Sequence, residues 1–454
     1  MELSFEELVK SVNGEIVADN NYHNFNNVSI DTRKIDKENV YIALNGENFN
    51  GNKFVIEAFK KGASIAIVDE VLFDKSEAEK LGVVIKVEDT YKALTELAKY
   101  YRNKLDIKIV AVTGSTGKTS TKDLIAAFLS EKYKVLKTKG NFNNHIGMPL
   151  MILNLDSSYD VAVLEHGMSN FNEIHNLVEC SRPDIAVITN IGISHIENLK
   201  TQENIFKAKM EVVDFFDKNN TLIVNAEDKY LNTVKSDRFK VVKTGYNNNL
   251  DFVAENVEAL AQKTIFTIAG EGKQYKFILP MSGKHNVLNA LLAIAAAKEL
   301  DVTFEEMIAG IKNIENTSMR LEFIKNEGIT IINDCYNASP DSMESALDVL
   351  KNSEGNRKVA ILGTMRELGD ESDFAHTCVG AYAKDKADLL IAIGEYSEFY
   401  KSGFGNNNIM VYNNKEEIIN DLDKIIVKGD VVLVKASRTL KFEKIVSELS
   451  KISF

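Results

Sequence analysis

The chain has 454 residues, of which 44% are hydrophobic and 26% are charged, values that are normal for a globular protein. At roughly 150 residues per domain, this length predicts about three domains. The formal net charge of -12 argues against duplex nucleic acid and against an anionic membrane as the binding partner.

Neither the cysteines nor the N-terminal stretch indicates an exported protein. Cys180, Cys335 and Cys378 are scattered and form no CxxC pair, so we expect no disulfide scaffold and no zinc site. The stretch MELSFEELVK is acidic and amphipathic, without the basic start and apolar core of a signal peptide. No apolar run reaches the ~18 residues of a membrane span. We therefore expect a reduced, cytoplasmic, monomeric protein without membrane insertion.

Residues 1–105 form the first predicted domain, in which short apolar runs alternate with helical stretches. Strands are expected at 39–44, 63–69 and 82–87, and helices at 52–62 and 91–105.

A second domain, residues 106–313, opens with a strand, a loop and a helix. The apolar run 107–114 ends in glycine, and residues 118–133 continue with helical spacing. Residues 160–167 and 184–192 are further apolar runs that end in polar residues or glycine, as buried parallel strands do. Residues 283–300 predict a helix that is rich in alanine and leucine.

Residues 314–454 form the third predicted domain, in which strands and helices alternate. Strands are expected at 328–334, 358–363, 388–394, 408–412 and 430–436, and helices at 339–352, 373–386, 415–426 and 439–450. This alternation predicts a doubly wound sheet, so the fold class is α/β in three domains.

The loop AVTGSTGKTSTKD (111–123) resembles a phosphate-binding loop that is two residues short of the common spacing. Glycines let the backbone approach phosphate oxygens, and the start of the helix adds positive potential. Lys118 can reach the β- and γ-phosphates of ATP, and the Thr119 hydroxyl can bind Mg²⁺. An ordinary turn with chance glycines is the alternative, and the coincidence of strand, glycines, Lys-Thr and helix disfavours it. The predicted ATP loop comprises Gly114, Ser115, Thr116, Gly117, Lys118, Thr119 and Ser120.

Several stretches together resemble the Mur ligase family, the ATP-dependent amide ligases of peptidoglycan and folate metabolism. In chain order they are TGSTGKTSTK, TKGNFNNHIGMPL, VITNIGISHIENLKTQENIFKAK, SGKHNVLNALLAIAAA, MRLE, DCYNASPDS and LVKASR. The resemblance covers nearly the whole chain. It implies a UDP-MurNAc-binding N-terminal domain, a central P-loop ATPase-like domain with a parallel sheet, and a C-terminal Rossmann-like domain that binds the incoming amine.

Within this family the chain is most similar to the branch that joins D-Ala-D-Ala to UDP-MurNAc-tripeptide. The stretches DCYNASPDS and ILGTMRELG carry this similarity, and neither a GxGxxG nor a DNPR motif is present. The sequence departs from the family pattern at His166, at the stretch 172–174 and at Thr364. These departures bear more on the identity of the substrate than on the class of reaction. The alternatives are a ligase that adds the third residue, a paralogue outside the cell wall, and a non-catalytic nucleotide-binding protein.

The resemblance implies a catalytic set of Lys118, Glu165, His195 and Lys209. It places Mg²⁺ on Thr119, Glu165, His195 and Lys209, with the lysine carbamylated by CO₂. Carbamylation would turn a cation into an oxygen ligand, which suits Mg²⁺. From the residues alone, Glu165 could be a solvated strand-terminal acid, His195 a structural hydrogen-bonder, and Lys209 a surface lysine.

The remaining expected contacts fall into two groups. For ATP they are Asn286 and Asn289 at the adenine, which lie three apart on one helix face, Arg320 at the phosphates and Asp334 near the ribose. For the UDP-muramoyl peptide and the dipeptide they are Ser29, Thr32, Arg33, Asn141, Asn143, Asn144, Asn337, Lys435 and Arg438. The asparagines of the 141–144 stretch could instead simply form turns.

Overall fold

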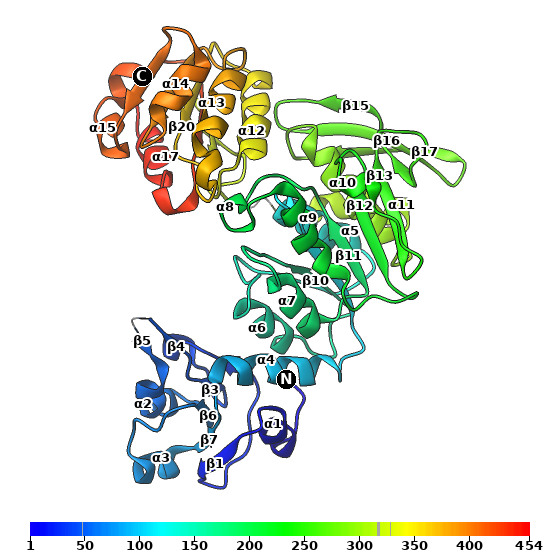
Figure 1. Ribbon diagram of the computed structural model, residues 1–454, viewed down its shortest axis with the longest axis vertical. Coiled ribbons are helices and arrows are strands. Elements are labelled where there is room, and N and C mark those ends of the chain that lie inside the picture. Colours follow the sequence, from blue (N-terminus) through cyan, green and yellow to red (C-terminus); the bar gives the residue numbers. More distant parts are fainter. Residues whose placement is uncertain (48, 316–317, 327) are drawn as a thin grey trace.

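In the computed structural model, which describes residues 1–47, 49–315, 318–326 and 328–454, three α/β units follow one another along the longest axis (Figure 1). The N-terminal unit lies at the bottom of the view, the central unit in the middle and the C-terminal unit at the top. Each unit is built around its own sheet. No helix in the described part of the chain is long and apolar enough to cross a membrane.

The N-terminal unit is a five-stranded sheet in the order β1-β7-β6-β3-β2, in which only β1 runs antiparallel to its neighbour. Its strands are β1 (Glu15–Ala18), β2 (Val28–Ser29), β3 (Val40–Ile42), β6 (Ile65–Val68) and β7 (Val83–Lys86), with a separate hairpin of β4 (Asn45–Gly46) and β5 (Phe49–Asn50). Its helices are α1 (Phe5–Ser11), α2 (Val55–Lys60), α3 (Lys75–Leu81) and α4 (Thr90–Arg102). The strands predicted at 39–44, 63–69 and 82–87 are confirmed.

Helix α4 joins the N-terminal unit to the central one. Asp89 caps its first turn, because its side chain accepts hydrogen bonds from the backbone N–H groups of Tyr91 and Lys92. The helix that follows is amphipathic. Its buried face, which includes Leu94 and Leu97, shares one hydrophobic cluster with Met148 of helix α6. The two units therefore share a core at this junction.

The central unit is a seven-stranded, fully parallel sheet in the order β14-β13-β12-β11-β8-β10-β9. Its strands are β8 (Lys108–Thr113), β9 (Val135–Lys137), β10 (Val161–Glu165), β11 (Ile185–Ile188), β12 (Thr221–Asn225), β13 (Lys240–Gly245) and β14 (Phe252–Val253). Its helices are α5 (Lys118–Leu129), α6 (Gly147–Leu153), α7 (Glu173–Ser181), α8 (Ile196–Leu199), α9 (Gln202–Met210), α10 (His285–Lys298) and α11 (Phe304–Gly310). Strand β8 lies between β10 and β11, so the loop after it opens at the edge where such sheets bind ligands.

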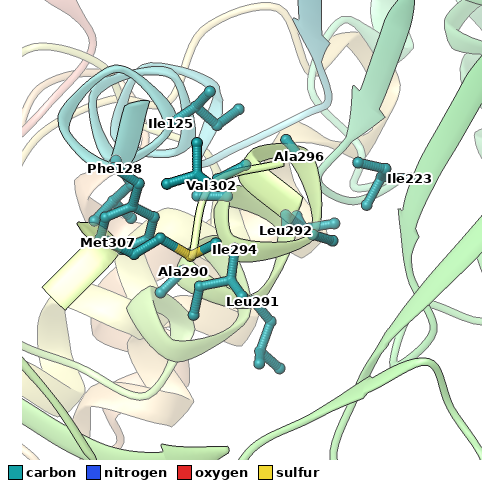
Figure 2. Packing of buried hydrophobic residues seen from close by; sticks show 14 of the residues in the cluster. Ile125, Phe128, Ile223, Ala290, Leu291, Leu292, Ile294, Ala296, Val302 and Met307 are labelled. Carbon is teal, nitrogen blue, oxygen red and sulfur yellow. The ribbon is translucent and has the colours of Figure 1, made fainter. Parts of the chain in front are cut away.

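The core of the central unit lies where α5, α10 and α11 meet (Figure 2). Phe128 and Ile125 of α5 lie beside Ile294 of α10 and Met307 of α11. Helix α10 is apolar around most of its circumference and is buried along most of its length, as the alanine-rich sequence indicates. This packing fixes α5, and with it the loop that precedes α5.

A three-stranded antiparallel sheet, β15 (Glu255–Ala259), β16 (Thr264–Gly270) and β17 (Lys273–Leu279), covers one side of the central unit. The sequence analysis assigned no strands between residues 193 and 282, so it missed this sheet and also β12 to β14. Strand β16 alternates buried and half-buried residues, because only one of its faces packs on the core. Because every second residue of β16 is less buried, the sequence shows no continuous apolar run that would indicate a strand.

The C-terminal unit is a six-stranded sheet in the order β18-β19-β23-β20-β21-β22, in which only β18 is antiparallel. Its strands are β18 (Glu322–Lys325), β19 (Thr330–Asp334), β20 (Arg357–Leu362), β21 (Leu389–Ile393), β22 (Ile409–Tyr412) and β23 (Asp430–Lys435). Its helices are α12 (Pro340–Asn352), α13 (Ser372–Ala383), α14 (Ser397–Phe404), α15 (Lys415–Ile419), α16 (Leu422–Ile425) and α17 (Glu443–Leu449).

Two separate hydrophobic clusters cover the two faces of this sheet, which confirms the doubly wound α/β architecture. The sequence analysis missed α14, and the helix predicted at 415–426 is two short helices with a break at Asn420 and Asp421.

We expect Phe128→Ala to destabilise the protein by about 3–5 kcal/mol, because it leaves a cavity in a core that cannot collapse. Phe128 is fully buried, whereas Phe374, which is 68% exposed, offers a matched control with the same deletion. Denaturant unfolding followed by circular dichroism measures both. Equal losses in the two variants would contradict the packing in Figure 2.

Candidate active site

The loop between β8 and α5 has a backbone that only glycine fits at two positions. Gly114 has φ 146° and Gly117 has φ 79°, both in the left-handed half of conformational space. A Cβ added at Gly114 would lie 1.8 Å from the Thr189 hydroxyl oxygen, and one at Gly117 would lie 2.6 Å from Asn289 Oδ1. The loop is therefore packed tightly against β11 and α10.

The segment after β11 holds the loop in shape. Asn190 Oδ1 accepts from the Thr116 backbone N–H at 2.9 Å, and Asn190 Nδ2 donates to the Thr116 hydroxyl at 2.7 Å. The Ser115 N–H donates to the Asn190 carbonyl at 3.0 Å. Sequence reasoning quoted the stretch that contains Asn190 but did not select this residue. Its signal was its position directly after an apolar strand beside the loop strand.

Lys118 begins helix α5, and its side chain folds back over the loop. Its ammonium donates to the Gly114 carbonyl at 2.8 Å and to the Ser115 carbonyl at 3.4 Å. Burial lowers the pKa of Lys118, while the charges of Glu165 and Glu367 oppose that shift. No carboxylate of the described residues forms an ion pair with it. This cation is held in place for an anion that the chain does not supply.

Thr119 and Glu165 form the oxygen-rich part of the site. The Thr119 hydroxyl donates to Glu165 Oε2 at 2.8 Å, and Asn143 Nδ2 donates to Glu165 Oε1 at 3.0 Å. The Glu165 N–H donates to the Thr138 hydroxyl at 2.9 Å, which fixes the end of β10. Mg²⁺ prefers a few oxygen donors and keeps several waters, so a hydroxyl beside an oriented carboxylate fits it.

The three asparagines of the 141–144 stretch, which were expected to contact the substrate, have different surroundings. Asn143 positions the Glu165 carboxylate, and Asn144 Oδ1 accepts from the Gly147 N–H at 2.9 Å at the start of α6. Asn144 therefore forms the turn that was the alternative reading of this stretch. Asn141 is exposed on the same loop.

Lys209 lies on α9 and is only 1% exposed. Burial holds its pKa well below the usual range, and the charge of Lys118 lowers it further. Its amine has no ion-pair partner among the described residues. Lys207, two residues earlier, is exposed and paired with Glu203 at 2.7 Å. The two lysines are thus clearly different in environment.

His195 lies at the start of α8, in a left-handed backbone conformation with φ 66°. Its Nδ1 pairs with Glu367 of the C-terminal unit, so the group expected to bind metal contacts a carboxylate from across the domain boundary. In the described parts of the chain, no group of three or more His, Cys, Asp and Glu side chains could hold a metal ion. A metal site here needs the Thr119 hydroxyl and a further oxygen donor.

A cavity of about 650 Å³ lies in front of the loop, between the central and C-terminal units. Of the residues expected to bind ATP or substrate, it brings together Ser115, Thr116, Gly117, Lys118, Thr119, Ser120, Asn286, Asn289, Arg320, Asp334, Asn337 and Lys435. Asn289 Nδ2 donates to Asn286 Oδ1 at 3.0 Å, and Asn286 Nδ2 donates to the Ser282 carbonyl at 2.7 Å. The volume is within the range of small-molecule sites.

Arg320 is the cation that the C-terminal unit contributes to this cavity. Its guanidinium stacks on the Tyr336 ring at 4.0 Å, and its buried Nε has no hydrogen-bond partner among the described residues. It lies close enough to Lys118 to lower the pKa of that lysine. An unsatisfied buried donor beside a second cation indicates a place for an anion.

Lys435, which was expected to contact the substrate, is bonded to other residues of the C-terminal unit. Its ammonium pairs with Asp334 Oδ2 at 2.5 Å and donates to the Asn337 carbonyl at 2.8 Å. The lysine and its partner are the last residues of the neighbouring strands β23 and β19 and lie opposite each other in the sheet. His285, which sequence reasoning did not select, lines the same cavity, and burial lowers its pKa to about 4.

The three residues proposed for the uridine diphosphate lie together on the N-terminal unit, outside both cavities described here. Arg33 makes two hydrogen bonds to Asp31, at 2.9 and 2.8 Å. Ser29 donates to the Asp31 carbonyl at 3.1 Å, and Thr32 donates to Glu57 at 3.3 Å. Their role in substrate binding stays a prediction.

Two departures from the family pattern have structural positions. His166 is fully buried, its Nδ1 and Nε2 lie 3.0 Å from the Leu164 carbonyl and the Ser181 hydroxyl, and burial lowers its pKa to about 4. It is a satisfied interior histidine away from both cavities. Thr364 is buried beneath its loop and lines neither cavity.

Comparisons with known proteins agree with this geometry along the chain. Three family models match: the Mur ligase family catalytic domain at residues 24–102, the Mur ligase middle domain at 112–297, and the Mur ligase glutamate ligase domain at 319–438. A UDP-N-acetylmuramoyl-tripeptide–D-alanyl-D-alanine ligase of Bacillus subtilis is 40% identical over 93% of this chain and 92% of its own length. The chain belongs to the Mur ligase family.

The chain is also similar to other ligases of this family. A ligase of the same name from Escherichia coli is 34% identical over 93% of each chain. Among solved structures, MurF from Acinetobacter baumannii superposes with a TM-score of 0.90 at 28% identity, over 99% of both chains. MurF from Thermotoga maritima in complex with ADP has a TM-score of 0.82 at 27% identity, over 94% of this chain and 97% of that one.

We expect Gly114→Ala to weaken nucleotide binding by at least about tenfold, because the new Cβ collides with Thr189 and overpacking costs about 1–3 kcal/mol. Gly272→Ala is the matched control, since Gly272 also has positive φ, 80°, but no atom lies within 4 Å of its added Cβ. Calorimetric titration with ADP measures the effect. The prediction fails if both variants bind ADP like the parent protein.

Proposed function

We propose that this Mur ligase joins D-Ala-D-Ala to UDP-MurNAc-tripeptide at the expense of ATP, in the last cytoplasmic step of peptidoglycan pentapeptide precursor synthesis. The observation that carries the proposal is the cavity that the phosphate loop and Arg320 of another domain line together, with Thr119 of this loop hydrogen-bonded to Glu165. The substrates follow from near-full-length relatives whose names state this reaction. ATP and nucleotide-linked sugars are cytoplasmic metabolites, which supports a cytoplasmic location.

The reaction has two steps. A carboxylate oxygen of the tripeptide attacks the γ-phosphorus of ATP, the bond to the β-phosphate oxygen breaks, and an acyl phosphate and ADP result. The dipeptide amine then attacks the acyl carbon, loses a proton, and phosphate leaves from the tetrahedral intermediate. Both steps move negative charge between crowded oxygens, so prepositioned cations should supply most of the catalysis.

Lys118 and Arg320 are the cations for the transferred phosphoryl group. Lys118 is fixed at the helix start by loop carbonyls, and Arg320 reaches the same cavity from the C-terminal unit. Neither cation has a carboxylate partner among the described residues. Because Arg320 belongs to the other domain, the full positive field exists only when the two domains face each other.

Thr119 and Glu165 are the proposed Mg²⁺ ligands. Asn143 holds one Glu165 oxygen, and the Thr119 hydroxyl holds the other, so the carboxylate keeps one orientation. When bound, Mg²⁺ would supply positive charge that stabilises the negative charge on the phosphate groups. His195 and Lys209 complete the expected set, and Lys209 requires carbamylation, because an ammonium would repel the ion.

The test is phosphate release by the purified protein with Mg²⁺, ATP, UDP-MurNAc-tripeptide and each candidate amine. We expect turnover with D-Ala-D-Ala and little with D-Ala, meso-diaminopimelate or L-Lys. Lys118→Ala should slow turnover at least ~10²-fold, because nothing else in the loop brings a cation to the γ-phosphate. If the protein adds a single amino acid to a UDP-muramoyl dipeptide and ignores D-Ala-D-Ala, it is a third-residue ligase instead.

We expect Lys209 to carry a carbamate, because burial lowers the pKa of its amine and so favours the unprotonated form, which reacts with CO₂. In ¹³C-bicarbonate, the protein should show one carbamate carbon signal by NMR. Lys209→Ala should remove the signal and most of the activity, and formate should restore part of that activity. Lys207→Ala, at an exposed lysine two residues away, is the control and should keep both. Full activity of Lys209→Ala would rule the carbamate out.

A further inference from the structure

A second, smaller cavity of about 130 Å³ lies beside the ATP cavity, at the same domain boundary. The central unit contributes Ser194 and His195 to it, and the C-terminal unit contributes the loops after β19, β20 and β23. Two consecutive residues of the first loop, Arg366 and Glu367, carry opposite charges into this cavity. The sequence analysis noted their stretch, GTMRELG, but assigned no role to either residue.

The backbone of this loop is anchored at three points. The Met365 N–H donates to His376 Nε2 at 3.0 Å, and the Arg366 N–H donates to the Ser437 hydroxyl at 2.9 Å. The Ser437 N–H donates to the Thr364 carbonyl at 3.2 Å, which ties the loop to the end of β23. The side chains of Arg366 and Glu367 are therefore carried by a fixed backbone.

The loop also holds the central unit. The Glu197 N–H of α8 donates to the Glu367 carbonyl at 3.3 Å, and α8 lies against the start of the C-terminal unit's 3₁₀ turn Gly369–Glu371 (Figure 1). The Glu367 carboxylate pairs with His195 through Oε2. No hydrogen bond of the described residues uses its Oε1, and the side chain is 55% exposed. One oxygen of the Glu367 carboxylate therefore faces outward from the loop after β20.

The two arginines of the small cavity differ in their partners. Arg438 pairs with Glu443 at 3.0 Å and its guanidinium contacts Met319. Arg366 forms no ion pair with any carboxylate of the described residues. Arg366 is exposed and lines the cavity, and its backbone is anchored. A guanidinium without a carboxylate partner is suited to bind a ligand carboxylate through its planar fork.

We propose that Arg366 binds the terminal carboxylate of the acceptor dipeptide and that Glu367 binds its amine-bearing end. This inference rests on the proposed function, and it names the residues that determine acceptor specificity. The amine must reach the acyl phosphate in front of Lys118, and Glu367 is the member of the pair that lies within the field of Lys118. A dipeptide zwitterion therefore lies with its amine toward the central unit and its carboxylate toward the C-terminal unit.

This assignment places the dipeptide carboxylate at Arg366 and not at Lys435, which the sequence analysis expected among the substrate contacts. Lys435 is 2% exposed, pairs with Asp334 and lines the larger cavity, where ATP is expected. Its charge is already neutralised within the C-terminal unit. A single amino acid, which is shorter than a dipeptide, cannot place its amine at Glu367 and also offer Arg366 a carboxylate one residue further on.

The test removes the charge from each side of the proposed contact. The parent protein should prefer D-Ala-D-Ala to D-alanyl-D-alaninamide, which lacks the carboxylate, by about 10-fold or more in kcat/KM. Arg366→Gln should lower kcat/KM for the dipeptide by a similar factor and leave that for the amide unchanged, so the preference disappears. The KM for ATP should not change. If Arg366 had only a structural role, Arg366→Gln would lower kcat/KM equally for the dipeptide and for the amide.

Arg438→Gln is the matched comparison, because it removes a guanidinium from the same cavity. The inference is overturned if Arg438→Gln, and not Arg366→Gln, abolishes the preference, or if Arg366→Gln keeps it. Failure of the parent protein to use D-Ala-D-Ala at all would instead refute the proposed function, so the two failures are distinguishable.

Glu367 has its own readout, which separates acceptor binding from support of His195. Glu367→Gln should raise the KM for D-Ala-D-Ala about 10-fold. It should leave unchanged the positional isotope exchange of ¹⁸O-labelled ATP with UDP-MurNAc-tripeptide, a measure of acyl phosphate formation without dipeptide. A fall in that exchange with an unchanged dipeptide KM would show that Glu367 acts through His195 and would overturn its part of the inference.

Discussion

A set of poorly compensated cations at the edge of one parallel sheet is the constraint on which the rest of the site depends. Among the described residues, Lys118 is held by loop carbonyls and has no carboxylate partner, and the buried Nε of Arg320 has no hydrogen-bond partner. Such an arrangement is unfavourable in an empty protein and becomes favourable when phosphate groups enter. The net charge of -12 makes this local positive region a selective place for an anion.

The fold assembles these groups from segments that are far apart in the chain. The loop after β8 carries Lys118, the end of β10 carries Glu165, and the segment after β11 carries His195. These strands are neighbours in one parallel sheet, so their carboxyl ends meet at one edge. Tight packing of Gly114 on Thr189 keeps the loop at this edge, and the core around Phe128 holds the helix behind it.

The C-terminal unit divides the domain boundary into two chemically different cavities. The larger one contains the phosphate loop, Arg320 and the neutralised Asp334–Lys435 pair. The smaller one contains His195 together with the oppositely charged Arg366 and Glu367. Their shared boundary at Asn337 and Ser339 places the two compartments side by side. A nucleotide and a zwitterionic acceptor can therefore approach the same reacting carbon from two directions.

The sequence by itself determined the fold class, the loop with its lysine and threonine, and the order of the long buried strands. These features depend on local patterns, because a strand buried on both faces is continuously apolar and the loop needs glycine at fixed places. The sequence analysis missed β12 to β17. Strands β15 to β17 alternate more and less buried residues, which weakens the apolar run, whereas β12 is fully buried but only five residues long. The expectation that Glu165, Asn286 and Asn289 belong to the nucleotide site came from the family resemblance of the sequence.

Only the tertiary structure decided which polar groups are free and which are already paired. Lys435, Arg438 and Arg366 look alike in the sequence as cations at or soon after the ends of strands. In the part of the chain that the structure describes, the first two have carboxylate partners and Arg366 has none. His166 and His195 both follow strands, but one is satisfied in the interior and the other contacts a second domain. Pairing depends on contacts between residues that are far apart in the chain, 172 positions in the case of His195 and Glu367, and no local pattern records such contacts.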